Sequence, residues 1–288
     1  MGNNDFAAWH TDLCAGEPAA GSVGLLPWDS QVFGFPVGEY RAGSCGWATV
    51  HAGRVHDALL RWAEQNQVEV CTASIPAAQH DWIALLPEWG FRFIDFTLRM
   101  ALPGLQRATL PESRITLRPA EPADAPATAA IAQRAFRFGR YFADARFPEF
   151  LAAKRFYEWV ANAIQGAGPG ACVYILEDRG HIDGFSHVTI DRDTADLSLP
   201  ALDLHLQKSL LGYELYLATL RLLKDRGVNQ VTGKISCANT GVTNICAMLG
   251  FRFSEPEAVF HWHSPAARHL HPPPHRQSAS GNTVERAL

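Results

Sequence analysis

Apolar positions along the chain follow two periods, which predict alternating helices and strands. Helical segments have an apolar residue every three or four positions, and strand segments are short apolar runs bounded by polar residues or glycine. Over residues 55–100 the predicted order is helix, strand, helix and strand: Val55–Gln65, Val68–Ile75, Ala78–Trp89 and Phe91–Met100. This order favours an α/β or α+β fold built on a mixed sheet.

The same order returns near the C-terminus. Gly90-Phe91-Arg92-Phe93 recurs as Gly250-Phe251-Arg252-Phe253, an offset of 160 residues, and five further identities share that offset without a gap. The matching segments are Tyr213–Lys224, Val228–Ile235, Thr240–Leu249 and Phe251–His263. Nine identities at one offset, within matching local patterns, predict two copies of one folding unit.

The second copy is preceded by elements that the first copy largely lacks. They are strand Ile115–Arg118, a helix from Glu121–Asp124 through Ala135, helix Phe147–Ala163, the hairpin strands Ala171–Glu177 and His181–Asp191, and strand Asp196–Asp203. The first copy has only the fragment Gly24–Tyr40 in this place. Two prolines and a glycine in Leu102–Ser113 predict a linker. We therefore expect an abridged, non-catalytic domain over residues 1–105 and a complete domain over residues 113–263.

Composition narrows the class of protein. Hydrophobic residues make up 47% of the 288 residues and charged residues 19%, which excludes a wholly disordered chain. A net charge of −4 argues against a nucleic-acid partner. No run of 18 apolar residues predicts a membrane span, and the first ten residues do not resemble a signal peptide. The six cysteines are scattered without a C-x-x-C pair, so we interpret them as reduced thiols of a cytoplasmic protein.

The last segment, residues 264–288, contains four prolines and three histidines and little that a core would bury. Its composition predicts a disordered tail.

From Ile115 to His263 the element order resembles the GCN5-related N-acetyltransferases. In that family a loop of the type Q/R-x-x-G-x-G/A follows the fourth strand, and its amides hold the coenzyme A pyrophosphate at the start of a helix. The run Gln207-Lys208-Ser209-Leu210-Leu211-Gly212 is similar, with Leu210 in place of the middle glycine. The resemblance implies acetyl-CoA as co-substrate.

A second family pattern follows the loop. Asn239 and Asn244 match its asparagine-rich start, and the resemblance places them at the cofactor. Counting from Asn239 and from Gly250 puts Cys246 where the family often has a tyrosine that protonates the departing thiolate. A thiol with a pKa near ~8.5 is able to do the same, or is a small buried residue without chemistry. Tyr213 and Tyr216 are expected to be packing residues.

The remaining catalytic candidates lie on the predicted strands. The resemblance implies that the backbone amide of Leu202 stabilises the oxyanion of the tetrahedral intermediate. Asp196 stands where the family often has an acidic residue, and His187 is a base of suitable pKa on the neighbouring strand. A water relay is the alternative to both.

Two unusual strings resemble the acetyltransferases of amino-sugar nucleotides, the dTDP-fucosamine type. They are Leu26–Pro36 (LPWDSQVFGFP) and Phe138–Pro148 (FGRYFADARFP). The resemblance implies acceptor-binding residues in the second string: Arg140, Tyr141, Phe142, Asp144 and Arg146. Arginine suits the phosphates of a nucleotide, and aromatic rings suit a base or a sugar face.

The resemblance implies an acetyl-CoA-dependent N-acetyltransferase acting on the amine of a nucleotide-linked amino-deoxy sugar for surface polysaccharide. The alternatives are an acyltransferase for another small amine and a degenerate module that only binds CoA or a nucleotide sugar. A homodimer is compatible with each of these functions. His261-x-His263 places two imidazoles on one strand face, but no partner stands at ligand spacing, so we expect no metal site.

Overall fold

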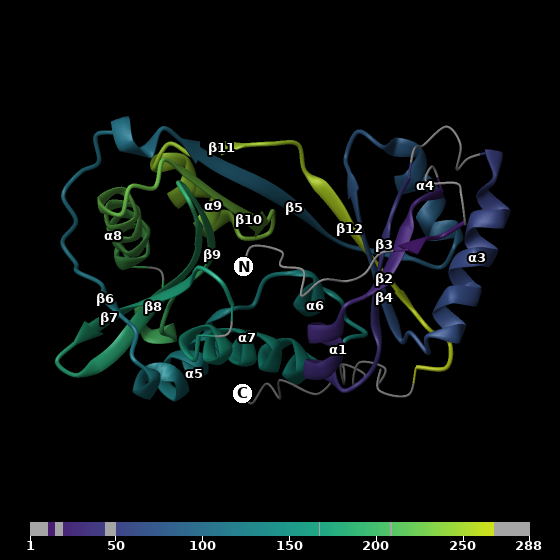
Figure 1. The fold of residues 1–288 in the computed structure, drawn as a ribbon, viewed down its shortest axis with the longest axis horizontal. Coiled ribbons are helices and arrows are strands. Elements are labelled where there is room, and N and C mark those ends of the chain that lie inside the picture. Colours follow the sequence, from purple (N-terminus) through teal and green to yellow (C-terminus); the bar gives the residue numbers. More distant parts are fainter. Residues whose placement is uncertain (1–10, 15–19, 44–49, 167, 208, 268–288) are drawn as a thin grey trace, which may run out of the picture.

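One sheet runs through both copies of the repeat (Figure 1). The computed structural model describes residues 11–14, 20–43, 50–166, 168–207 and 209–267. The strand order is β1-β2-β3-β4-β12-β5-β10-β9-β8-β7-β6, with β11 paired to β5 off this path. Strands from both ends of the chain therefore meet in the middle of the sheet.

Residues 11–103 form the N-terminal half. Its elements are β1 (Thr11–Asp12), β2 (Ser22–Leu25), α1 (Pro27–Phe33), β3 (Val37–Arg41), α3 (Ala52–Gln65), β4 (Val70–Pro76), α4 (His80–Glu88) and β5 (Arg92–Pro103). A 3₁₀ turn, η2 (Leu105–Arg107), follows.

Residues 118–263 form the C-terminal half. It begins with β6 (Arg118–Pro119), η3 (Pro122–Asp124), α5 (Ala125–Ala135), α6 (Arg140–Ala143), α7 (Glu149–Ile164), β7 (Ala171–Asp178), β8 (His181–Asp191) and β9 (Thr194–Leu202). It continues with η4 (Leu204–Leu206), α8 (Leu211–Asp225), β10 (Gln230–Ser236), α9 (Thr240–Met248), β11 (Arg252–Phe253) and β12 (Glu257–His263).

The two halves exchange their last strands. β5, the last strand of the N-terminal half, pairs with β10 and β11 of the C-terminal half. β12, the last strand of the C-terminal half, pairs with β4. Register follows the 160-residue offset: Ser236 lies opposite Thr97 in one pair, and the equivalent residues Pro76 and Glu257 lie opposite each other in the other. The exchange makes the sheet continuous across the junction.

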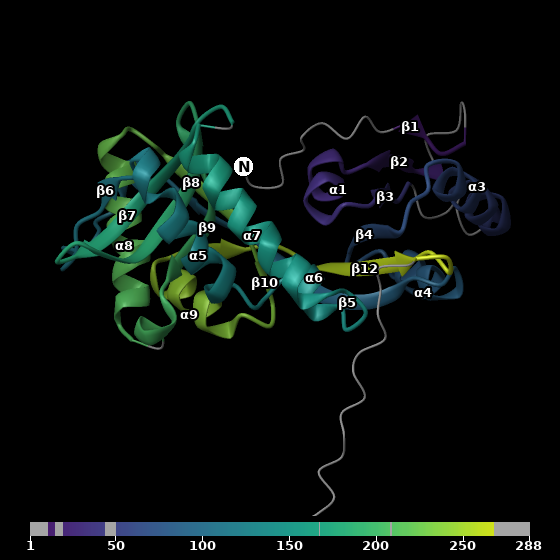
Figure 2. The same ribbon diagram turned by 90° about the horizontal axis from the view of Figure 1, so that it is seen from below.

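Alternation along the strands distributes the core over both faces of the C-terminal half. Val173 and Ile175 pack with α5 and α7, whereas Tyr174 between them packs with α8 and α9. The N-terminal half has its own core, which includes the apolar stripe Val55, Leu59 and Ala63 of α3. Figure 2 shows α7 running from the C-terminal half toward α6 at the junction.

A further apolar cluster joins the two halves. Phe33 of the first unusual string packs edge-on against Tyr141 and Phe147 of the second, with ring centroids 4.8 Å apart in both pairs. The two strings, far apart in the sequence, thus form one packed unit.

The fold class predicted from the sequence is confirmed, with differences at the element ends. The closing segment 251–263 is two strands, β11 and β12, because Pro256 and its polar neighbours interrupt the run. Only Arg118–Pro119 of the strand expected from Ile115 pairs with a neighbour. From residue 268 on, the expected tail lies outside the described residues. Within the described part of the chain, no helix is long and apolar enough to cross a membrane.

Candidate active site

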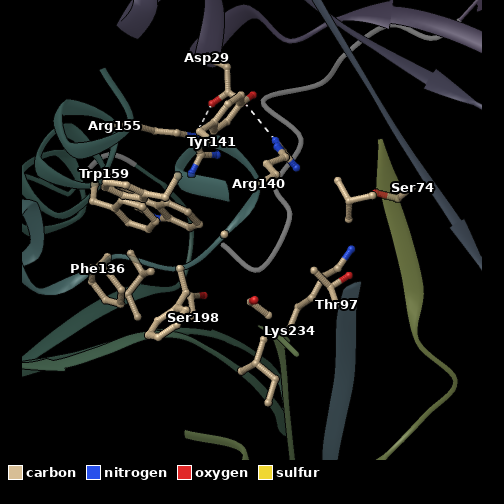
Figure 3. A pocket seen from close by; sticks show the side chains of 18 of the residues that line it. Asp29, Ser74, Thr97, Phe136, Arg140, Tyr141, Arg155, Trp159, Ser198 and Lys234 are labelled. Carbon is tan, nitrogen blue, oxygen red and sulfur yellow. Dashed lines mark hydrogen bonds and ion pairs between the residues drawn. The ribbon is translucent and has the colours of Figure 1, made fainter. Parts of the chain in front are cut away.

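A cavity of about 730 Å³ lies between the two halves (Figure 3). Both halves line it, with β3, β4 and β5 on one side and β9, β10 and the α5–α7 segment on the other. Its wall is mixed. The aromatic lining residues are Trp28, Tyr40, Phe136, Phe138, Tyr141, Phe142, Phe156, Trp159 and Tyr216, and the charged ones are Asp29, Glu39, Arg41, Arg99, Arg140, Arg155, Asp196, Lys234 and Glu257.

On one side of the cavity, β9 and β10 separate. They pair in parallel over only three rows, the last being Asp196 opposite Thr232. The pairing of β8 with β9 skips Ser198, which is therefore a β-bulge residue. Ser198, Leu199 and Pro200 line the cavity beyond the last paired row. The split exposes strand backbone to a ligand, which paired strands do not.

Asp196 stands where the split begins. Its carboxylate accepts hydrogen bonds from Ser198 Oγ (2.6 Å) and Thr232 Oγ1 (3.4 Å). Burial raises the pKa of Asp196, and these hydrogen bonds only partly oppose it. A carboxylate with a raised pKa is a stronger base than an ordinary one.

Tyr216 of α8 reaches the same cavity from the hydrophobic cluster beneath it. Burial, with a smaller contribution from Cys246, raises the pKa of Tyr216 well above its usual value, so its hydroxyl keeps its proton. The sequence analysis expected a packing residue here. The sequence did contain one signal for this position: Tyr216 is four residues after Gly212, so both lie on the same face of the predicted helix, next to the predicted cofactor loop.

Asp29 lies beneath the aromatic wall and binds two arginines. It accepts hydrogen bonds from Arg155 Nε (2.7 Å), Arg140 Nη2 (3.2 Å) and the hydroxyl of Tyr141 (2.8 Å). Burial alone raises the pKa of Asp29, but the two guanidinium groups outweigh burial and hold it below its usual value. Two guanidinium groups thus share this one carboxylate, and Glu39 of β3 adds a second negative charge that acts on Arg140.

Aromatic rings surround the Arg155 guanidinium. It lies 4.9 Å from the ring centroid of Trp28 and 5.0 Å from that of Trp159. Phe156 stacks in parallel between Phe136 (4.7 Å) and Trp159 (6.5 Å). The rings form an aromatic wall of the cavity beside the charged groups.

A second charged group spans the exchanged strands. Glu257 of β12 accepts hydrogen bonds from Lys234 Nζ of β10 (2.5 Å) and Arg99 Nε of β5 (3.1 Å). Burial lowers the pKa of Lys234 and outweighs the effect of Glu257. Here, too, two cations share one carboxylate.

Five of the residues predicted from sequence line the cavity: Arg140, Tyr141, Phe142, Asp196 and Asn239. Asn239 is also the N-cap of α9, where its Oδ1 accepts a hydrogen bond from the Val242 amide (3.2 Å).

The predicted cofactor loop leads into α8 outside the cavity lining. Ser209 Oγ donates to the Leu206 carbonyl (2.6 Å) and accepts from the Leu211 amide (3.3 Å). Leu210 is the N-cap residue and is 79% exposed, so its side chain points away from the fold. Gly212 begins the helix with Leu211, and Lys208 lies outside the described residues.

Gln207, Leu202 and Asn244 do not line the cavity either. Gln207 Nε2 donates to the Leu202 carbonyl (3.4 Å), and the Leu202 side chain is buried in an apolar cluster. Asn244 is exposed on α9. The bulge at Ser198 brings strand amides closer to the cavity than Leu202 does.

Two predicted catalytic groups are buried away from the cavity. Cys246 has no exposed surface, lies in the hydrophobic cluster under α8, and has a pKa that burial raises to about 12. His187 has no exposed surface, and burial lowers its pKa to about 3. Neither ring nitrogen of His187 has a partner among the described residues, and its ring packs against Trp159 at 6.2 Å. These positions argue against a direct role for either side chain in proton transfer.

Asp144 and Arg146, predicted to bind the acceptor, turn away from the cavity. Asp144 is 3% exposed and contacts His261 and His263 of β12. Arg146 lies beside it, with Nε 3.9 Å from Asp144 Oδ1.

The mixed sheet with helices on both faces matches the fold of solved GCN5-related N-acetyltransferases. No protein-family model and no curated protein matches the sequence. Solved structures do. A GCN5-related N-acetyltransferase from Sphaerobacter thermophilus is similar with a TM-score of 0.62 and 15% identity, over 85% of this chain and 76% of that chain.

Two further structures share the fold. A tandem protein of this fold from the clavulanic acid biosynthesis pathway has a TM-score of 0.53 and 14% identity, over 84% of this chain and 78% of that chain. A glucosamine N-acetyltransferase region of a fungal multi-domain β-N-acetylglucosaminidase has a TM-score of 0.59 and 13% identity, over 84% of this chain and 31% of that chain. The resemblance to the superfamily predicted from sequence is thereby confirmed at the level of the fold.

Proposed function

We propose that the protein is an acetyl-CoA-dependent N-acetyltransferase whose active centre is the split between β9 and β10. The split carries this proposal because it opens strand backbone into a cavity that also contains a base and an acid. The loop Gln207–Gly212 and the start of α8 would hold the cofactor pyrophosphate through backbone amides and the helix dipole.

The residues around the split supply the steps of acyl transfer. The nitrogen of the neutral acceptor amine attacks the thioester carbonyl carbon, and Asp196 takes the proton that this nitrogen loses as the carbon–nitrogen bond forms. An amide at the Ser198 bulge stabilises the oxyanion that forms. When the carbon–sulfur bond breaks, Tyr216 donates its proton to the thiolate of coenzyme A. Tyr216 thus takes the role that the sequence analysis gave to Cys246.

The acceptor in this proposal is an amine on a nucleotide-linked amino sugar. The cavity lining carries five cationic side chains and four carboxylates, and this net positive charge favours an anionic acceptor such as a sugar diphosphate. The aromatic wall suits a base or a sugar face, and the amine would lie toward Asp196. One structural relative is a glucosamine N-acetyltransferase region, so a sugar amine has a precedent on this fold.

Release of coenzyme A thiol, measured with and without acceptor, tests the function. Tyr216→Phe should lower kcat by about 10²-fold or more, since general acid catalysis contributes on that scale. Cys246→Ala is the matched control within the same cluster and should leave kcat within about twofold. If Cys246→Ala lowers kcat and Tyr216→Phe does not, the assigned acid is wrong.

Acceptor use is tested separately. A nucleotide-linked amino sugar should be acetylated with a much lower KM than the same amino sugar without its nucleotide. Calorimetry with acetyl-CoA alone separates the remaining alternative. A folded protein that binds acetyl-CoA but acetylates neither sugars nor other small amines would be a binding module, and the proposed function would be wrong.

A further inference from the structure

Asp144, His261 and His263 form a buried cluster outside the cavity. Asp144 Oδ2 lies 2.8 Å from His261 Nδ1 and 2.5 Å from His263 Nε2. The side chains are 2%, 0% and 3% exposed, respectively. None of the three lines the cavity, so the proposed transfer chemistry does not use them.

The fold brings these residues together from distant segments. His261 and His263 are two positions apart on β12, so both rings lie on one face of the sheet. Asp144 is the C-cap residue of α6, and the ring centroid of Tyr141 in the same helix lies 5.4 Å from that of His261. Because β12 is the strand that crosses into the N-terminal half, the cluster joins that strand to the C-terminal half.

Each residue directs one metal-ligating atom toward the others. The three atoms all lie within 4.8 Å of one another. The second oxygen of Asp144, Oδ1, is occupied elsewhere: it accepts the Arg146 amide (3.0 Å) and lies 3.9 Å from Arg146 Nε. Oδ2 is thus left to the two imidazoles, and a fixed second oxygen is typical of carboxylates that bind metals.

We propose that Asp144, His261 and His263 bind a divalent transition-metal ion, with zinc the best match. Two imidazole nitrogens and one carboxylate oxygen are a donor set typical of Zn²⁺. Metal–ligand bonds of about 2.0–2.2 Å require the two oxygen–nitrogen distances to lengthen by less than about 1 Å, which small side-chain rotations supply.

The role of the ion is structural. It fixes β12, and with it the strand exchange, to the α6–α7 segment. The signal in the sequence was the His-x-His pair, and the missing third ligand came from a segment more than 100 residues away.

Metal content of the full, untagged chain tests the site. Elemental analysis after purification with Zn²⁺ should find about one equivalent, and a chelator should lower Tm. Co²⁺ added to the metal-free protein should give the visible absorption of a histidine-ligated ion. Asp144→Asn, which keeps a hydrogen-bond acceptor but loses the charge, should bind less than a tenth as much metal.

Two controls separate this site from other histidines. Replacing His269, His271 and His275 together by Asn should leave one equivalent bound, as should His187→Gln, which changes a buried histidine outside the cluster. If the triple variant loses the metal instead, the tail binds it and the proposal is wrong.

The wild type decides the case even if Asp144→Asn does not fold. A wild-type protein that contains no metal, and whose Tm does not respond to Zn²⁺, Co²⁺, Ni²⁺ or Mn²⁺, would show that the three residues are only a hydrogen-bonded clamp. That result would overturn the proposal whatever the enzymatic activity.

Discussion

The two halves differ most at one equivalent pair of strands. In the N-terminal half, β3 pairs with β4 through four of its five residues, Val37 to Tyr40. In the C-terminal half, β9 pairs with β10 through only three of its nine residues, Thr194 to Asp196. The strand pair is therefore closed in the N-terminal half and split in the C-terminal half. The split leaves the backbone of β9 beyond Asp196 without pairing to β10, next to the cavity.

Individual residues account for the difference. In β9, Pro200 lies beyond the last row paired with β10, and proline has no amide to donate to a neighbouring strand. In β3, Tyr40 is paired with β4 and fully buried, and its hydroxyl donates to the Ala20 carbonyl (3.0 Å). The bulge at Ser198 directs β9 further from β10. We infer that the N-terminal half serves as a wall of the acceptor site and transfers no acetyl group.

Removing Asp29 should cause the largest loss of stability, because this residue of the N-terminal half binds two arginines of the C-terminal half. Asp29→Ala leaves the partly buried Arg140 and Arg155 without their carboxylate. Loss of one partner of a buried ion pair typically costs about 3–5 kcal/mol, and we expect a decrease of that size in the free energy of unfolding, measured with denaturant.

The matched control removes a carboxylate from an exposed pair. Glu149→Ala breaks the ion pair with Arg137, in which both side chains are largely exposed, and should cost no more than about 1 kcal/mol. Equal losses for Asp29→Ala and Glu149→Ala would mean that the Asp29 cluster does not hold the halves together.

Much of the fold was predictable because its signal is periodic. Apolar spacing and the 160-residue repeat predict the helices, the strands and the two copies. The strand exchange was not predicted, because similar strands in two copies of a repeat do not indicate whether each pairs within its own copy or with the other copy. Tyr216 packs in a hydrophobic cluster as expected, but its access to the cavity was not predicted, nor was the position of Asp144 outside the cavity lining. The partners of a side chain depend on tertiary packing, which no local spacing encodes.

Asp196 tests the split half directly. Asp196→Asn keeps the size of the side chain and one of its two acceptor oxygens but removes the base, so kcat should fall by about 10²-fold. The expected folding stability is close to that of the wild type, which circular dichroism and thermal melting check. An unchanged kcat would mean that Asp196 is not the base. A water relay would then be the remaining candidate, and no residue at the split between β9 and β10 would take the proton.

The pH dependence should follow the same residue. Because burial raises the pKa of Asp196, kcat/KM should increase with pH through a midpoint above 3.8, and Asp196→Asn should lack this limb. The effect on stability has the opposite sign. A carboxylate with a raised pKa in the folded state stabilises the fold below its unfolded pKa, and this contribution is lost as the pH rises through the folded value.

The smallest expected effect concerns Gly233 of β10, whose equivalent in the closed half is Ala73. A Cβ at Gly233 would lie 2.5 Å from Met100 Cε and 3.0 Å from the Leu197 carbonyl oxygen. The methionine end can move but the backbone of β9 cannot do so freely, so Gly233→Ala should lower the free energy of unfolding by about 1–2 kcal/mol. Gly53→Ala in α3, where a Cβ meets nothing within 4 Å, is the control and should be neutral or slightly stabilising. If Gly233→Ala is as stable as the wild type, then β9 and β10 tolerate the methyl group that Ala73 carries in the N-terminal half. The difference between the halves would then depend on Pro200 and the bulge alone.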